Sequence, residues 1–132
     1  MTDLVATVPQ KLWEAWLAEG DRAGTPFTGN EYGWITGRRV GHEKHPKPPI
    51  DVGERLYIVA RGLLRGYAPV TSVGMADGRW VIFRRGGAVA VTLYSPIEGF
   101  QGWRKRWWGR QYEIPFPEWE TAVGPKGKPR RR

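Results

Sequence analysis

Two kinds of hydrophobic pattern follow one another along the chain. In the first, apolar side chains recur at the spacing of one helix face: Leu12, Trp13, Trp16 and Leu17. Pro9 suits the first helical position, Thr7 is a candidate cap and Gly20 is a stop signal. We therefore predict a helix over residues 9–19 whose tryptophans pack in the core, because aromatic side chains supply large buried areas.

The middle of the chain has the second pattern, in which β-branched or aromatic residues alternate with polar ones. Four stretches show it: 55–61, 63–73, 79–85 and 88–94. The MADG segment at 75–78 is a turn signal, and Gly86-Gly87 predicts a hairpin turn. We therefore expect an antiparallel meander of at least four strands.

Glycine, proline and polar residues dominate residues 21–52, which predicts long loops with one short strand near 34–36. The YEIPFPEW segment (112–119) is expected to be extended, and residues 124–132 to form a disordered basic tail. One helix, a meander and long loops predict a single small α+β domain over residues 1–123, with a curled sheet or an open barrel.

Composition restricts the classes of function. The formal net charge is +8, and the tail carries five of the positive charges, which leaves +3 for residues 1–123. A basic small domain favours an anionic partner, above all nucleic acid. The absence of cysteine excludes disulfide scaffolds and thiolate-rich metal sites. No apolar run has the length of a membrane span and no signal-peptide pattern is present, so we expect a cytoplasmic protein with no membrane partner and no cofactor.

One stretch, 51–73, resembles a known fold family. It has a Gly53-Glu54-Arg55 turn, an apolar strand, Gly62, and a second strand that re-enters as Gly66-Tyr67-Ala68-Pro69-Val70. This order of turn, strand, glycine and strand resembles the pattern of the PUA-like superfamily of pseudobarrel domains, which includes the ASCH and EVE groups. The resemblance implies a small PUA-like β-pseudobarrel that binds RNA, or modified bases in DNA or RNA. We expect the N-terminal helix to pack on it.

The segment GFQGWRKRWWGRQY (99–112) interleaves tryptophans with cations. Nucleic acid attracts both, because phosphates bind cations and bases stack on aromatic rings. The predicted phosphate-binding residues are Arg104, Lys105, Arg106 and Arg110, with Arg38 and Arg39 extending the basic surface. The predicted stacking platforms are Trp108 and Tyr112. In the alternative interpretation Trp103 and Trp107 complete the core, and we expect two of the three tryptophans to be buried.

The segment TPFTGNEYGWITGRR (25–39) is a candidate base pocket. Its hydroxyls, amide and aromatic rings suit an extruded base, which is held by hydrogen bonds to its edge and by rings above and below. The candidate pocket residues are Thr28, Asn30, Tyr32 and Trp34. The alternative is an ordinary surface loop with Thr-Gly and Asn turns.

Two other classes of function stay open. The first is a small hydrolase that cuts RNA or deacylates a nucleoside, with Thr25, Thr28, Lys44 and Glu98 as its candidate residues. ASCH amidohydrolases place a lysine near an early threonine, and this chain has no lysine a turn before either threonine. The second is a protein-binding inhibitor module, because Trp, Tyr and Arg are enriched at binding hot spots. His42 and His45 are three apart in a proline-rich segment, so we expect no metal site.

Overall fold

The structure is a computed structural model that describes residues 2–21, 23–39 and 47–115. The described chain is a small α+β domain with one α-helix and mostly strands. The helices are α1 (Gln10–Glu19) and the 3-10 helix η1 (Arg110–Tyr112). The strands are β1 (Leu4–Thr7), β2 (Pro26–Arg39), β3 (Arg55–Ala60), β4 (Leu63–Pro69), β5 (Ser72–Ala76), β6 (Arg79–Gly86), β7 (Val91–Thr92), β8 (Trp103–Lys105) and β9 (Ile114–Pro115). The predicted basic tail, 124–132, lies outside the described residues.

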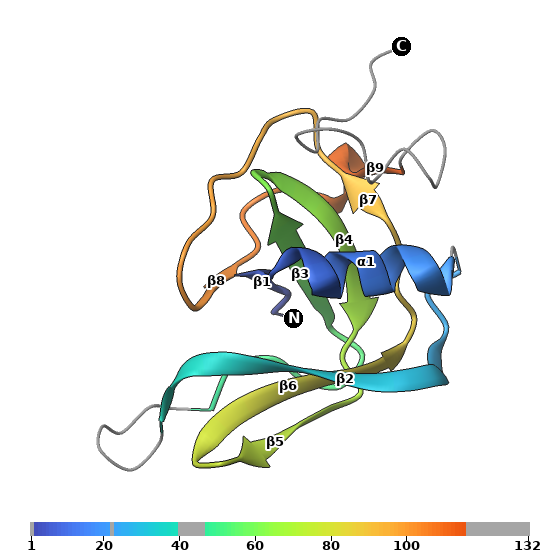
Figure 1. The fold of residues 1–132 in the computed structure, drawn as a ribbon. Helices are drawn as coiled ribbons and strands as arrows, with labels where there is room; N and C mark the ends of the chain where they lie inside the picture. Colours follow the sequence, from blue (N-terminus) through green and yellow to red (C-terminus); the bar gives the residue numbers. More distant parts are fainter. Residues whose placement is uncertain (1, 22, 40–46, 116–132) are drawn as a thin grey trace.

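A four-stranded sheet in the order β4-β3-β1-β8 forms the centre of the fold (Figure 1). Strand β1 lies parallel to β3 and antiparallel to β8, so it is an interior strand. Its residues Leu4, Val5 and Ala6 have no exposed surface. No strand was predicted here, because three apolar residues are too short a pattern to distinguish a strand from a loop.

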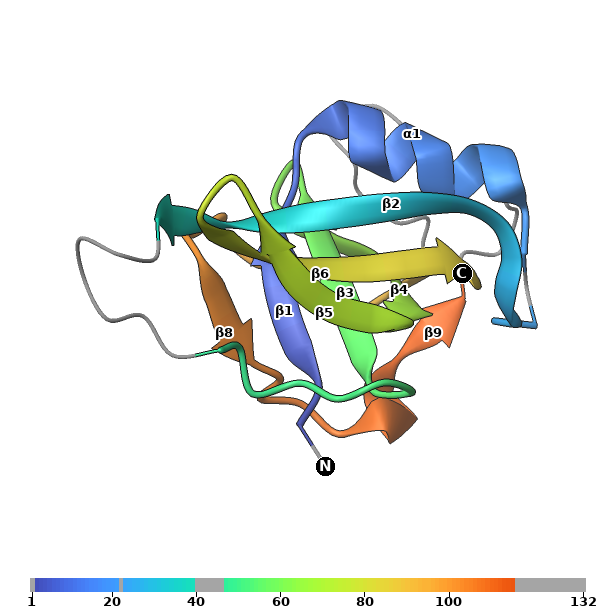
Figure 2. The same ribbon diagram turned by 90° about the horizontal axis from the view of Figure 1, so that it is seen from below.

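The second sheet has the order β2-β6-β5 and lies below the first in Figure 1. Its β5–β6 hairpin turns at Asp77 and Gly78, whose φ angles of 51° and 71° are typical of a type I′ turn, so the predicted turn at 75–78 is confirmed. Strand β2 has 14 residues, where only a short strand near 34–36 was predicted. Its polar residues are compatible with a strand because it lies at an edge of this sheet (Figure 2).

The predicted hairpin at Gly86-Gly87 is wrong. Strand β6 pairs with β2 and β5, whereas β7 pairs with β9, so the two glycines carry the chain from one sheet to another. Their φ angles are 69° and 74°, and a Cβ on Gly86 would lie 2.4 Å from Thr28 Oγ1. The predicted single meander is wrong for the same reason, because the 63–73 strand divides between β4 and β5 in different sheets. The described strands form three sheets, none of them closed into a barrel.

Helix α1 confirms the predicted helix and packs across the central sheet over β3 and β4 (Figure 1). Pro9 is the N-cap and Gly20 ends the helix with a left-handed φ of 60°. Thr7 does not cap the helix; its hydroxyl accepts a hydrogen bond from the Phe100 backbone N–H at 3.0 Å. Trp13 and Trp16 are buried, as predicted.

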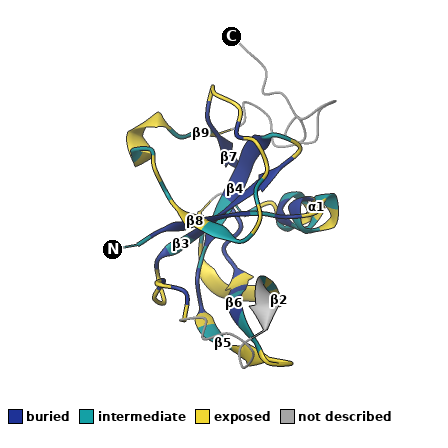
Figure 3. Cartoon of the chain, turned by 90° about the vertical axis from the view of Figure 1, so that its left-hand side faces the viewer, coloured by how far each residue is buried: buried dark blue, intermediate teal, exposed yellow. Residues whose placement is uncertain are grey.

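Burial is concentrated in the central strands and in the inner face of α1, whereas β5 is largely exposed (Figure 3). In the part of the chain that the structure describes, no helix combines the length and the apolar composition needed to cross a membrane.

Candidate functional site

The tryptophan–arginine segment lies along the edge of the central sheet. Trp103 opens β8, which pairs with β1, and its side chain is half-buried against the core. Trp108 is also half-buried against the core, whereas Trp107 is 54% exposed. Two of the three tryptophans, Trp103 and Trp108, therefore pack against the core, but both are half-buried rather than buried as predicted. The four-residue spacing of Trp103 and Trp107 does not give them a common face, because Trp103 lies in β8 and Trp107 in the irregular segment that follows it.

Four ring contacts join the exposed tryptophan to the core. Phe100 and Trp107 have centroids 6.4 Å apart, and Trp107 and Trp108 meet edge to face at 5.0 Å. Trp108 then contacts Tyr57 at 5.2 Å, and Tyr57 contacts Tyr67 at 5.3 Å. We call these five residues the aromatic row. Because its inner members are packed in the core, the exposed ring of Trp107 has a fixed support.

A buried polar group fixes the inner part of the aromatic row. The indole N–H of Trp108 donates to Glu113 Oε2 at 2.8 Å, and Arg55 pairs with the other Glu113 oxygen at 3.4 Å. Arg55 also lies 4.0 Å over the Tyr67 ring and donates to the Tyr57 hydroxyl. Burial, followed by the Glu113 carboxylate, raises the pKa of Tyr57 well above its ordinary value. Trp108 is thus held by its ring and by its N–H.

Asp3 ties the segment to the N-terminal strand. Its side chain is 1% exposed, and Oδ2 accepts from Arg106 Nε at 3.1 Å and from Arg110 Nη2 at 2.8 Å. The Arg55 backbone N–H donates to Oδ1 at 2.9 Å. Burial raises the pKa of Asp3, but the Arg55 N–H and the two guanidiniums lower it by more, so the net pKa lies below its ordinary value. Asp3 therefore stays ionised at neutral pH.

The predicted phosphate-binding cations therefore differ in their surroundings. Arg106 holds Asp3 and the Trp108 carbonyl, which makes it part of the support of the segment. Arg110 holds Asp3 but keeps 40% of its side chain exposed. Arg104 and Lys105 are exposed, and Arg104 lies 4.4 Å over the Phe100 ring. The side chains of Arg38 and Arg39, at the end of β2, lie outside the described part.

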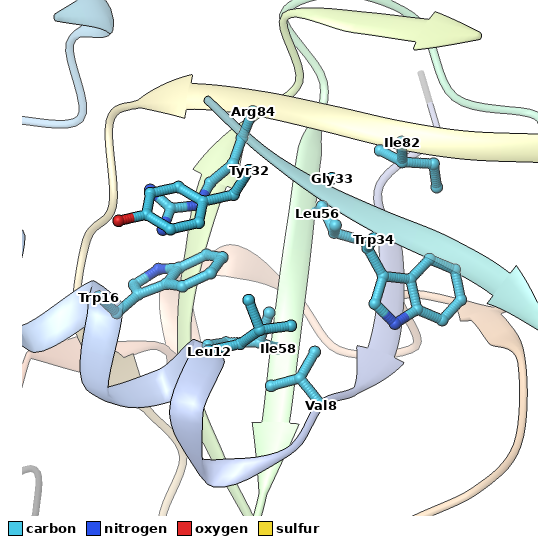
Figure 4. Close-up of a pocket in the computed structure, with 10 residues that line it drawn as sticks. All are labelled: Val8, Leu12, Trp16, Tyr32, Gly33, Trp34, Leu56, Ile58, Ile82 and Arg84. Carbon is cyan, nitrogen blue, oxygen red and sulfur yellow. The ribbon is translucent and has the colours of Figure 1, made fainter. Parts of the chain in front are cut away.

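The candidate base-pocket residues separate into two groups. Tyr32 and Trp34 are half-buried and line a cleft between α1 and β2 (Figure 4). Thr28 and Asn30 are exposed and do not line it, and the Thr28 hydroxyl donates to the Thr25 carbonyl at 2.7 Å. Alternate residues of β2 do not share one face throughout, because its register with β6 shifts between Pro26 and Glu31.

Arg84 is the cleft residue that sequence reasoning missed. Its guanidinium lies between two aromatic rings, 3.8 Å from the Trp16 centroid and 4.3 Å from the Tyr32 centroid. One nitrogen, Nη1, pairs with Glu19. Burial lowers the pKa of Arg84, and Glu19 opposes part of that shift. The signal in the sequence was weak, because RWVIFRRG reads as a strand whose arginines face solvent.

The hydrolase candidates do not form a catalytic arrangement in the described residues. Thr25, Thr28 and Glu98 are all exposed, and no hydrogen bond in the described part joins Glu98 to either threonine. Lys44 lies outside the described residues, as do His42 and His45. Among the described residues no cluster of three His, Asp or Glu side chains could hold a metal ion.

Comparison with known proteins gives no similar family model, no similar curated protein and no similar solved structure. The resemblance of residues 51–73 to the PUA-like superfamily stays a prediction.

Proposed function

We propose that this protein is a nucleic-acid-binding domain that holds single-stranded RNA on the surface formed by Phe100, Arg104, Lys105, Trp107, Arg110 and Tyr112. We call it the basic-aromatic surface. The proposal includes a PUA-like fold and a cytoplasmic place of action. The observation that carries it is the exposed Trp107 ring, supported by the aromatic row and flanked by exposed cations.

The chemistry of the surface suits the flat faces and the charge of RNA. Trp107 and Tyr112 are 54% and 65% exposed, so each offers a ring face to a base. Base stacking on an aromatic side chain is worth about 1–3 kcal/mol per base. Arg104 is exposed over the Phe100 ring, and Lys105 is exposed on the other face of the edge strand β8. Both cations meet the phosphates, as does the exposed part of Arg110.

Preorganisation favours this surface over an ordinary exposed loop. A ring already held by its neighbours loses little conformational entropy when a base stacks on it. Trp107 has Trp108 and Phe100 against it, and Trp108 is anchored through Glu113. In this proposal Trp108 supports the Trp107 ring from the core side, and Trp107 is the main stacking platform.

The test is a titration of fluorescent oligo-uridine RNA with the full chain and with two variants. We expect Trp107→Ala to weaken binding by about 5- to 150-fold, as the stacking energy of one base requires. We expect Arg104→Ala with Lys105→Ala to weaken binding and to reduce the salt slope by about 0.7 for each phosphate that the variant no longer neutralises.

Matched controls separate the surface from general effects of charge and aromatic area. Tyr94→Ala removes a 60% exposed ring from another loop, and Lys11→Ala with Arg85→Ala removes two exposed cations elsewhere. Both controls are expected to bind RNA as the parent does. Equal losses in the controls, or no RNA binding by the parent, would contradict the proposal and favour a protein partner.

A further inference from the structure

The cleft between α1 and β2 is a second, separate feature of the molecule. Its walls are mostly apolar and come from α1, from the segment before it and from strands β3 and β6: Val8, Leu12, Leu56, Ile58 and Ile82. The rings of Trp16, Tyr32 and Trp34 complete the walls (Figure 4). Flat apolar walls with few polar groups are typical of small-ligand sites.

Arg84 lines this cleft and carries an unused hydrogen-bonding edge. The residue is 2% exposed, and its Nε and Nη2 are buried without a hydrogen-bond partner among the described residues. These two nitrogens form one side of the guanidinium, and their N–H groups point in parallel, as in a bidentate fork. Buried donors are nearly always paired in folded proteins. The two unpaired nitrogens therefore indicate that a ligand supplies a pair of acceptors to this edge.

The charge around Arg84 indicates a neutral ligand. Glu19 already pairs with Nη1 and balances the positive charge. No other charged side chain lines the cleft among the described residues. A second buried anion beside Glu19 would be repelled by its carboxylate. The acceptors that fit are therefore two adjacent neutral atoms on a flat body.

We propose that the cleft accepts a guanine base, with O6 and N7 receiving hydrogen bonds from the Nη2 and Nε edge of Arg84. This pairing is the commonest specific contact between arginine and a base. Among bases that enter by the major-groove edge, guanine alone offers two neighbouring acceptors, so the site selects guanine in that orientation. The inference rests on the proposed function, because it names the base that the domain extrudes from a bound strand.

The cleft must widen to take the base. Its free space measures about 10 Å³, room for about one water molecule. Helix α1 and β2 must therefore part by the thickness of a ring. Trp16 lies on α1 and moves with it, so Arg84 stays stacked on Tyr32, its neighbour in the β2–β6 pairing. A single water bridging the two nitrogens is the competing occupant.

The first experiment uses the unmodified full chain and four nucleosides. Guanosine and inosine have both O6 and N7, 7-deazaguanosine lacks the N7 acceptor, and adenosine has a donor in place of O6. We expect guanosine and inosine to shift the NMR signals of the Trp16 and Trp34 indole N–H groups. 7-Deazaguanosine and adenosine are expected to bind about 5- to 150-fold more weakly, the range for one bidentate pair. Equal binding of all four would show that the Arg84 edge does not select the base, and binding of none would leave water as the occupant. Either result would overturn the inference.

The second experiment uses Arg84→Lys, which keeps the charge beside Glu19 but removes the fork. Guanosine binding is expected to be lost in this variant and kept in Arg85→Ala, the exposed neighbour on the same strand. If Arg84→Lys does not fold, the nucleoside series decides alone. Oligo-uridine, which contains no guanine, separates the two proposals. Tight oligo-uridine binding without guanosine binding would retain the basic-aromatic surface and reject the guanine cleft.

Discussion

Tryptophan meets arginine both at helix α1 and in the 99–112 segment, and the two regions differ in how they use the pair. In α1 the tryptophans are buried and the arginines reach them from the sheets, Arg65 at 4.0 Å over Trp13 and Arg84 at 3.8 Å over Trp16. In the 99–112 segment Trp107 stays exposed. The two residue types therefore do not by themselves identify a binding surface.

The difference lies in what the arginines find as partners. Arg65 is fully buried, donates to the Ala60 carbonyl, and its pKa is lowered to about 10 by burial and by Arg61. Arg106 and Arg110 share one buried carboxylate, Asp3, at the edge of the sheet. Both Trp107 and Trp108 lie between these two arginines, yet Trp108 packs against the core and Trp107 faces solvent.

The largest loss of stability is expected from substituting a buried tryptophan of the helix. Trp13→Ala removes a ring with no exposed surface and leaves a cavity beside the buried Arg65 guanidinium. We expect the free energy of unfolding in urea to fall by about 3–5 kcal/mol. Gln10→Ala, a change elsewhere on the helix, serves as the control. A loss below about 1 kcal/mol would show that the helix tryptophans are not structural.

The next largest effect is expected at Asp3. Asp3→Asn removes the charge that holds Arg106 and Arg110 and leaves a weaker acceptor in a buried place. Because both arginines are partly exposed, we expect a loss of about 2–3 kcal/mol in unfolding free energy, below the range for a fully buried pair. RNA binding should weaken as well. Asp51→Asn, an exposed carboxylate, is the matched control.

The stability contributed by Asp3 also depends on pH. The pKa of Asp3 is lowered in the folded chain from an ordinary value of 3.8. The ion pairs therefore contribute fully above about pH 3.8 and are lost as the pH falls through the lower folded-state pKa. We expect the difference in unfolding free energy between the parent and Asp3→Asn to shrink over that acid range. A constant difference would mean that the Asp3 charge does not stabilise the fold.

Local patterns predicted the helix and strands β3 and β6, because each of those segments carries its own period. The pairing of Asp3 with Arg106 and Arg110 joins residues more than 100 positions apart, and no local pattern marks it. The sequence therefore offered no means of ranking Trp107 against Trp108, and the prediction of Trp108 and Tyr112 as stacking platforms stays a prediction. Tyr32 and Trp34 were predicted as pocket residues, but Arg84 comes from a different strand and its partner Glu19 from the helix.

The smallest effect on stability, and the sharpest test of the comparison, is expected at Trp107. Trp107→Ala removes one edge-to-face contact with Trp108 and one with Phe100 at a side chain that is 54% exposed. We expect a loss of about 1 kcal/mol in unfolding free energy, because an aromatic pair contributes about 0.5–1.5 kcal/mol beyond its buried area. RNA affinity should fall in the same variant. Trp107→Phe should keep most of the stacking and recover part of the binding. If Trp107→Ala instead costs as much as Trp13→Ala, the ring is a core residue and the two regions of the molecule use tryptophan in the same way.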